Sequence, residues 1–353
     1  MIDPKDKNLP EIDAEDSQAS EHVKLSRRLF LGGSAALVGG AAAMGATMGG
    51  ALMPSVAHAS TDSKHTVGPG ELDEYYGFWS GGHQGEVRVL GLPSMRELMR
   101  IPVFNVDSAT GWGITNESKE VLGENAPLNG DCHHPHMSMT DGHYDGKYLF
   151  INDKANTRVA RIRGDIMKTD KITTIPNCQA IHGLRVQKVP YTKYIFANAE
   201  FRMPHPNNGL NMDDVEGYYT MFNGLDAESM DVAWQVIVDG NLDNTDADYT
   251  GKYAFSTCYN SEGAIDLPGS MRNERDHLVI FNIERIEAAV KAGKFITLPG
   301  SDVPVVDGRK GSELTRYVPV PKNPHGINTA PGGKYAVANG KLSPTVTVFE
   351  LAK

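Results

Sequence analysis

A seven-residue segment that recurs four times constrains the fold more than any other feature of this chain. The copies are Gly-Lys-Tyr-Leu-Phe-Ile-Asn from Gly146, Thr-Lys-Tyr-Ile-Phe-Ala-Asn from Thr192, Gly-Lys-Tyr-Ala-Phe-Ser-Thr from Gly251 and Gly-Lys-Tyr-Ala-Val-Ala-Asn from Gly333. Each copy combines a turn with a strand, and successive tyrosines lie 46, 59 and 82 residues apart. Units of roughly 40 to 50 residues built in this way are typical of a β-propeller, in which each unit forms one blade. We therefore expect an all-β propeller whose longest interval spans two blades.

The remainder of the chain after Tyr75 agrees with an all-β fold. Short β-rich runs alternate there with clusters of Gly, Pro, Asn and Asp. Helical spacing is clear in one stretch, 283–294, where isoleucine and valine recur among charged residues. A β-sandwich or a barrel could contain similar turn-strand segments by chance, but their recurrence at this period favours the propeller. The length available after Tyr75 suits about six blades.

Residues 1–59 have the pattern of a twin-arginine export signal. A polar, acidic start precedes Ser26-Arg27-Arg28-Leu29-Phe30-Leu31, a Gly/Ala-rich apolar run and the small-residue site Ala57-His58-Ala59. A membrane anchor is the alternative, although the small residues make the run only mildly hydrophobic. We predict cleavage after Ala59, a polar lead-in over 60–74, a propeller domain over 75–353, and export to the bacterial periplasm by the twin-arginine machinery.

Composition places the chain among ordinary globular proteins, with 40% hydrophobic and 22% charged residues. Its formal charge of -10 and its lack of a basic stripe argue against a nucleic-acid partner. The three cysteines, Cys132, Cys178 and Cys258, have no CxxC spacing. No disulfide framework is implied, and buried free thiols are expected.

Four histidines occupy one position in the repeat. They are His133 and His134 in Asp-Cys-His-His-Pro-His, His182 in Ala-Ile-His-Gly and His325 in Asn-Pro-His-Gly. The strand tyrosine follows His134 by 14 residues, His182 by 12 and His325 by 10. The first strand of every propeller blade faces the central channel, so equivalent positions in different blades converge on the axis. A single histidine before glycine more often caps a turn, whereas this coincidence favours a metal site, with copper or zinc as the metal.

Three stretches closely resemble the nitrous oxide reductases: Phe-Trp-Ser-Gly-Gly-His-Gln-Gly over 78–85, Asn-Gly-Asp-Cys-His-His-Pro-His over 129–136 and Val-Pro-Lys-Asn-Pro-His-Gly over 320–326. The similarity runs from Phe78 to Phe349. It implies a seven-bladed β-propeller, incomplete in this chain, whose axis holds a sulfide-bridged tetranuclear copper cluster with seven histidine ligands.

The resemblance assigns four of those copper ligands to this chain: His133, His134, His182 and His325. It implies that the other three ligands, and a C-terminal cupredoxin domain with a dinuclear copper site for electron entry, lie beyond residue 353. The chain is therefore expected to be truncated and, by itself, inactive.

The same family binds calcium beside the cluster. The resemblance implies backbone oxygens from Tyr259 and Met271, carboxylates from Glu262 and Asp276, and an oxygen from Asn323. Such hard oxygen donors suit calcium. Without the resemblance, scattered acids around a turn would be a weak signal.

The implied reaction is the final step of denitrification, the two-electron, two-proton reduction of nitrous oxide to dinitrogen and water. The resemblance also implies a periplasmic cytochrome c or cupredoxin as electron donor, and a homodimer in the complete protein. No catalytic residue beyond the metal ligands, and no proton donor, can be named. Two other classes stay open: a non-catalytic periplasmic propeller that binds partner proteins, and a mononuclear metal-dependent enzyme that uses three of the histidines.

Overall fold

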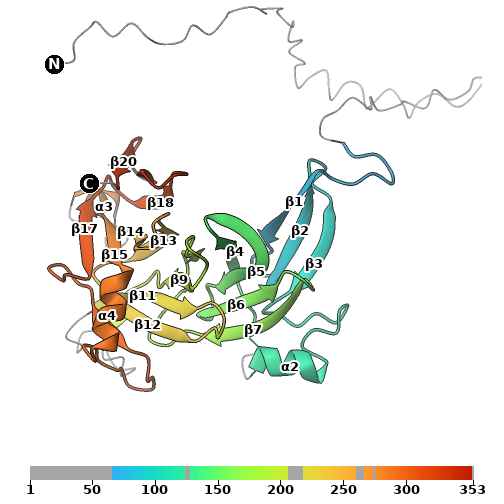
Figure 1. The fold of residues 1–353 in the computed structure, drawn as a ribbon, viewed down its shortest axis with the longest axis horizontal. Helices are drawn as coiled ribbons and strands as arrows, with labels where there is room; N and C mark the ends of the chain where they lie inside the picture. The colour runs from blue at the N-terminus through green and yellow to red at the C-terminus, as the bar shows by residue number, and fades with distance from the viewer. Residues whose placement is uncertain (1–65, 124–127, 206–217, 260–265, 273–275, 352–353) are drawn as a thin grey trace, which may run out of the picture. The chain divides into compact units, whose positions relative to one another are not determined.

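The computed structural model describes residues 66–123, 128–205, 218–259, 266–272 and 276–351 (Figure 1). The predicted signal over 1–59 and the predicted calcium ligand Glu262 lie outside the described residues. Among the described residues, no helix has both the length and the apolar character needed to cross a bilayer.

The described residues form five sheets that follow one another in chain order. The first contains β1 (Tyr75–Ser80), β2 (Glu86–Leu92) and β3 (Glu97–Pro102), and the second contains β4 (Cys132–Thr140), β5 (His143–Asp153), β6 (Arg158–Arg163) and β7 (Lys168–Thr174). The third contains β8 (Arg185–Val186), β9 (Tyr194–Asn198), β10 (Met203–Pro204), β11 (Tyr218–Asp226), β12 (Val232–Val238) and β16 (Val305–Asp307). The fourth contains β13 (Leu242–Ala247), β14 (Tyr253–Cys258), β15 (His277–Asn282) and β17 (Thr315–Pro319), and the fifth contains β18 (Pro324–Thr329), β19 (Tyr335–Gly340) and β20 (Val346–Glu350).

The first strands of these sheets are neighbours in space. Strand β1 contacts β4, β4 contacts β8, β8 contacts β13, and β13 contacts β18. The sheets therefore fan out from a common inner side, and they can be followed in colour order through Figure 1. The strands are antiparallel throughout, except where β12 pairs with β16. The all-β propeller class expected from the repeat is confirmed, and every repeat tyrosine lies on the second strand of its sheet.

The interval between Tyr253 and Tyr335 does not contain a further blade in the part of the chain that the structure describes. It contains β15 and β17 of the fourth sheet, two helices, and β16, which pairs in parallel with the edge of the third sheet. The expectation that this interval spans two blades was therefore wrong. The described residues form five sheets, and two helices and an edge strand account for the length of this interval.

Among the described residues, three short helices lie between the strands: α2 (Asn116–Leu122), α3 (Leu267–Arg272) and α4 (Ile283–Lys291). Helix α4 confirms the helical pattern read from the sequence. The side chain of Asn282 caps it by accepting a hydrogen bond from the Arg285 backbone N–H at 3.0 Å. Ile283 and Ile286 are buried against the aromatic core of the third and fourth sheets.

Aromatic side chains fill the space between the third and fourth sheets. The rings of Phe222 and Phe281 stack with centroids 3.8 Å apart, and Phe196 and Trp234 pack beside Phe222. Alternate residues of a strand point to opposite faces, so β11 and β15 can each present a phenylalanine to the neighbouring sheet. The blades are thus joined by apolar burial along their faces.

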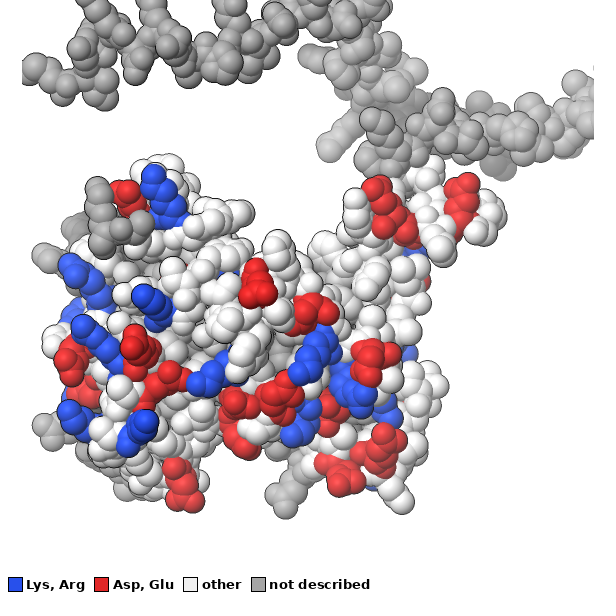
Figure 2. Space-filling model, in the orientation of Figure 1, with Lys and Arg blue, Asp and Glu red and all other residues white. Residues whose placement is uncertain are grey.

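Charged side chains of both signs are interspersed on the face shown in Figure 2. The described residues also form surface ion pairs, including Lys147 with Glu228 and Arg309 with Asp307 at 2.7 Å. Exposed pairs of this kind contribute little to stability. Apolar packing between the sheets contributes more to the stability of the fold.

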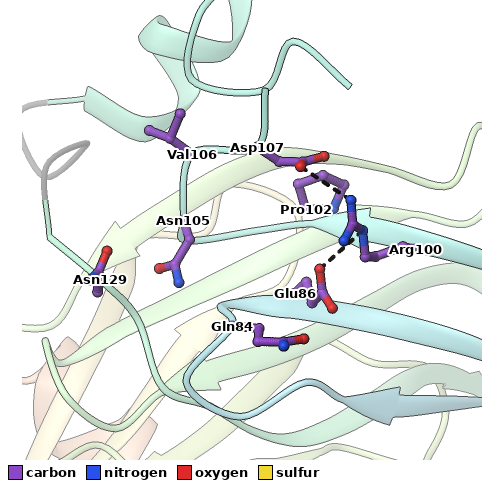
Figure 3. Close-up of a pocket in the computed structure, with 8 residues that line it drawn as sticks. All are labelled: Gln84, Glu86, Arg100, Pro102, Asn105, Val106, Asp107 and Asn129. Atoms are coloured by element: carbon purple, nitrogen blue, oxygen red, sulfur yellow. Dashed lines mark hydrogen bonds and ion pairs between the residues drawn. The ribbon is translucent and has the colours of Figure 1, made fainter. Parts of the chain in front are cut away.

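A polar pocket lies where the first sheet leads into the second (Figure 3). Arg100 forms ion pairs with Glu86 and Asp107, each at 3.2 Å. The side-chain oxygen of Asn105 accepts a hydrogen bond from the Gly130 backbone N–H at 2.6 Å. This contact fixes the chain just ahead of β4, the strand that carries two of the predicted metal ligands.

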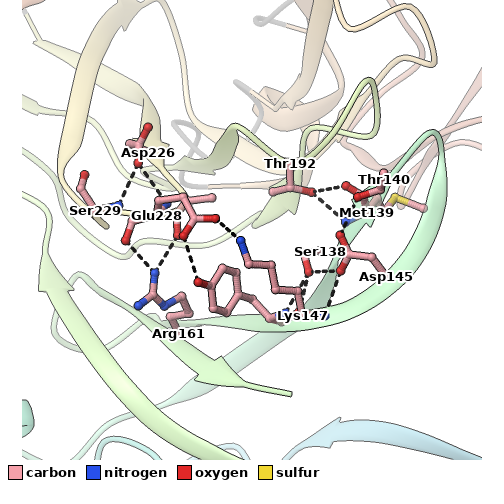
Figure 4. Close-up of polar contacts among 12 residues, drawn as sticks. Ser138, Met139, Thr140, Asp145, Lys147, Arg161, Thr192, Asp226, Glu228 and Ser229 are labelled. Atoms are coloured by element: carbon pink, nitrogen blue, oxygen red, sulfur yellow. Dashed lines mark hydrogen bonds and ion pairs between the residues drawn. The ribbon is translucent and has the colours of Figure 1, made fainter. Parts of the chain in front are cut away.

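A buried arginine joins the second and third sheets (Figure 4). The Arg161 guanidinium donates to the carbonyls of Ala227 and Glu228 at 3.0 and 2.7 Å. It also forms two parallel hydrogen bonds with the Asp170 carboxylate, at 3.0 and 2.7 Å. The turn between β11 and β12 is thereby fixed to β6.

The substitution Arg161→Ala should lower the free energy of unfolding by about 2 to 4 kcal/mol, because it leaves a carboxylate and two carbonyls without their donor. Arg161→Lys should restore little of this, since an ammonium cannot make the paired contact with Asp170. Urea denaturation followed by circular dichroism measures both. Arg163→Ala, at an exposed pair with Asp165, is the control and should leave the midpoint nearly unchanged. A urea midpoint for Arg161→Ala equal to that of the wild type would contradict the stabilising role of Arg161.

Candidate metal centre

Three of the four predicted copper ligands meet at the inner side of the sheets. His133 and His134 lie on β4, and His182 lies just ahead of β8. Nitrogen atoms of the three rings lie within 4.8 Å of one another. The Nε2 atoms of His134 and His182 are 3.1 Å apart, and the ring centroids of His133 and His182 are 5.3 Å apart. The repeat thus brings together side chains 48 positions apart, as equivalent positions in two blades should be.

An irregularity in β4 allows two adjacent histidines to approach the same partner. In a regular strand, neighbouring side chains point to opposite faces. Here the register with β5 shifts between His133 and His136, and His134 has a positive φ of 40°. Pro135 follows and cannot donate to the ladder. His136 diverges from the cluster and forms a hydrogen bond with Arg185.

Two of the clustered imidazoles, His133 and His134, have lowered pKa values that favour the neutral form. Burial, reinforced by the neighbouring His182 and His133, lowers the pKa of His134 to about 3. Burial also lowers the pKa of His133, although the Asp131 carboxylate opposes that shift. A neutral imidazole keeps a lone pair available to a metal ion. At neutral pH these two rings are therefore ready to coordinate.

Asp243 is a central residue of the site that the sequence analysis missed. It lies on β13, the first strand of the fourth sheet, and is 1% exposed. One carboxylate oxygen is 2.9 Å from Nδ1 of His182, and the other forms a hydrogen bond with Nδ1 of His325. Burial alone would raise the pKa of Asp243, but these two histidines outweigh it and hold the pKa well below its usual range. Asp243 therefore connects His325 to the cluster.

A signal for Asp243 was present in the sequence. It precedes the repeat tyrosine Tyr253 by 10 residues, and His325 precedes Tyr335 by the same number. Aspartate thus occupies in the fourth sheet the position that histidine occupies in the others. Asp243 was missed because the sequence prediction considered only histidines at this position.

Carboxylates orient three of the four predicted ligands. Asp243 holds Nδ1 of His182 and of His325, which leaves Nε2 of each ring for a metal. Asp131 lies 3.2 Å from Nε2 of His133 and holds that ring by its other side. The His325 side chain is 46% exposed and lies outside the compact group formed by the other three histidines.

The predicted calcium ligands converge in part. The Asp276 carboxylate accepts a hydrogen bond from the Asn323 backbone N–H at 2.6 Å, and both residues are buried. Tyr259 follows β14 and Asp276 precedes β15, where Cys258 and His277 are paired, so both flank one end of the same strand pair. Met271 is exposed on α3.

The three cysteines are free thiols, and Cys132 and Cys258 are buried. Burial raises the pKa of Cys178 and of Cys258 to about 12. A protonated thiol is a poor metal ligand. The raised pKa of these two thiols therefore argues against cysteine as a metal ligand.

The chain matches known proteins along most of its length. The family model for nitrous oxide reductase propeller repeat 2 matches residues 175–244, which include His182 and Asp243. The chain is 71% identical to nitrous-oxide reductase of Pseudomonas fluorescens over 93% of its length and 66% identical to that of Stutzerimonas stutzeri over 100%. It covers 53% and 56% of those two proteins, so it spans about half the length of these curated relatives.

A solved structure supports the fold alone. Hydrazine synthase of Kuenenia stuttgartiensis superposes with a TM-score of 0.50 at 12% identity, covering 79% of this chain and 62% of that one. Sequence identity, and not this structural likeness, carries the similarity to the nitrous-oxide reductases. The chain is a homologue of the nitrous-oxide reductases that corresponds to about half of their length and includes their second propeller repeat.

Proposed function

We propose that this chain supplies part of the copper site of a nitrous-oxide reductase, with His133, His134, His182 and His325 as ligands. The observation that carries the proposal is the meeting of three neutral or buried imidazoles within 4.8 Å, in a chain 71% identical to a nitrous-oxide reductase. The reaction would reduce nitrous oxide with two electrons and two protons to dinitrogen and water.

The residues present fit copper. Two Nε2 atoms 3.1 Å apart suit two donors on one ion when metal–nitrogen bonds are about 2 Å long. A set of imidazoles favours copper or zinc over calcium or magnesium. When bound, copper would bind nitrous oxide and supply electrons to it.

The protein's own task at this site is to hold and orient the imidazoles. Asp243 contacts His182 and His325 through Nδ1, which leaves Nε2 of each ring for a metal. Asp131 lies 3.2 Å from Nε2 of His133 and therefore holds that ring by its other nitrogen. Burial keeps His134 neutral and therefore able to coordinate.

The wider properties of the complete enzyme belong to the same proposal. In the complete enzyme, three further histidine ligands and a dinuclear copper site for electron entry would be present. A periplasmic cytochrome c or cupredoxin would deliver electrons, and the complete protein would form a homodimer. Export by the twin-arginine route would follow from the signal over 1–59.

Calcium binding beside the cluster is also proposed, with Tyr259, Glu262, Met271, Asp276 and Asn323 as ligands. The buried contact between Asp276 and Asn323 supports it, because Asn323 stands two residues before His325. A cation there would fix the loop that leads to His325.

Copper binding tests the proposal directly. The protein dialysed against copper(I) under reducing conditions should retain copper, and His182→Ala should weaken retention at least about tenfold, because it removes the central member of the three-histidine group. Elemental analysis after dialysis measures this. His143→Ala is the control, since His143 is exposed on β5 and outside the cluster.

Two other metal-binding results would favour a different function. Retention of one zinc ion per chain in preference to copper would favour the mononuclear enzyme. A wild-type protein that retains no metal would favour the non-catalytic binding propeller.

Asp243→Asn should weaken copper affinity by about 10- to 100-fold while leaving the ligands in place, because a carboxylate that orients a metal-bound imidazole typically contributes this much. Competition with a copper chelator of known affinity measures the change. Asp165→Asn, at an exposed carboxylate paired with Arg163, is the matched control. Equal affinities for Asp243→Asn and the wild type would show that Asp243 does not orient the ligands.

A further inference from the structure

A second set of residues shares one repeat position and lies around the histidine cluster. Each follows its repeat tyrosine by six residues, at or beyond the end of the second strand of its sheet. We call these four residues the outer ring: Lys154, Glu200, Tyr259 and Lys341. Unlike the inner histidines, they combine a carboxylate, a phenol and two ammonium groups.

The outer ring forms a chain of contacts from one sheet to the next. The Lys154 ammonium pairs with the Glu200 carboxylate, between the second and third sheets. The Tyr259 hydroxyl donates to the same carboxylate at 2.5 Å, between the third and fourth sheets. Lys341 of the fifth sheet lies 4.7 Å from the Tyr259 ring centroid. Each sheet that contributes a histidine or Asp243 is therefore connected to its neighbour.

The outer ring also touches the inner residues. Lys341 Nζ is 3.5 Å from the Asp243 carboxylate. A Glu200 oxygen lies within 4.8 Å of both a His182 nitrogen and an Asp243 oxygen. Glu200 is buried and is the one acid of the ring, so it takes contacts from both sides.

The contacts of Glu200 argue against a role as a ligand. Its two oxygens are engaged by Lys154 and by Tyr259. A metal ion placed between Glu200, His182 and Asp243 would have to displace an ammonium group and a hydroxyl. The arrangement fits a side chain that holds its neighbours in place.

We propose that the outer ring sets the spacing of the histidine-bearing strands, with Glu200 as its central positioning residue. The ligands come from separate sheets, and a metal site tolerates errors of only about 0.5 Å in their placement. Copper binding therefore depends on Glu200, although Glu200 does not bind copper. This inference rests on the proposed copper site.

The chain contains a matched control. Glu228 also pairs with Lys147 of the second sheet (Figure 4). It accepts a hydrogen bond from the hydroxyl of Tyr148, in the same sheet, at 2.9 Å. Glu228 stands on an exposed turn, and its contacts involve none of the four histidines. It therefore reproduces the chemistry of Glu200 without the connection to the cluster.

The test titrates copper(II) into the wild type, Glu200→Ala, Glu200→Gln, Tyr259→Phe and Glu228→Ala, and records affinity and the electron paramagnetic resonance spectrum. Glu200→Ala should bind about tenfold or more weakly, with fewer nitrogen ligands in the hyperfine pattern. Glu200→Gln retains an acceptor for Tyr259 and should be intermediate. Tyr259→Phe should lose less than Glu200→Ala, and Glu228→Ala should match the wild type.

The outcomes separate this inference from the proposed function. A wild type that binds no copper would overturn the copper site and, with it, the role of the ring. If the wild type binds copper and both Glu200→Ala and Tyr259→Phe have the affinity and spectrum of the wild type, only the role of the outer ring is overturned. Should Glu200→Ala fail to fold, Glu200→Gln and Tyr259→Phe decide the question by the same two measurements.

Discussion

The site depends on one buried charge, the carboxylate of Asp243. A carboxylate that is 1% exposed loses its hydration and is stable as an anion only when donors replace the lost water. Nδ1 of His325 forms a hydrogen bond with it, Nδ1 of His182 lies 2.9 Å from its other oxygen, and Lys341 adds a positive charge at 3.5 Å. The same bonds turn the two imidazoles so that Nε2 of each faces away from the carboxylate. One interaction thus stabilises the buried charge and orients two predicted ligands from different sheets.

The propeller fold brings side chains from several sheets to this one site. First strands are neighbours, so residues from the second to the fifth sheet meet although they are spread along the chain. Apolar packing, such as that of Phe222 against Phe281, holds the faces of the sheets together. Hydrogen bonds of Arg161, and of Glu200 near the cluster, also join neighbouring sheets. Unlike apolar packing, they require a specific geometry.

Much of this arrangement could be predicted from the sequence. The repeated tyrosine segments predicted the second strands, and the fixed offsets of His134 and His182 predicted their approach. The content of the interval between Tyr253 and Tyr335 could not be predicted, because β16 pairs with the third sheet and no local sequence pattern indicates that partner. Asp243 and Glu200 were missed because their residue types differ from those at the same offsets in other blades, while position alone relates them. The shift in β4 that lets His133 and His134 face one partner depends on backbone geometry, which spacing does not encode.

The central claim is that imidazoles from two sheets share copper at the inner side of the propeller. Anomalous X-ray diffraction at the copper absorption edge, from crystals of the copper-loaded protein, tests it most directly. The account predicts an anomalous peak about 2 Å from Nε2 of both His134 and His182. Copper bound only at His136, or at a surface histidine such as His143, with His134 and His182 still in direct contact, would contradict it.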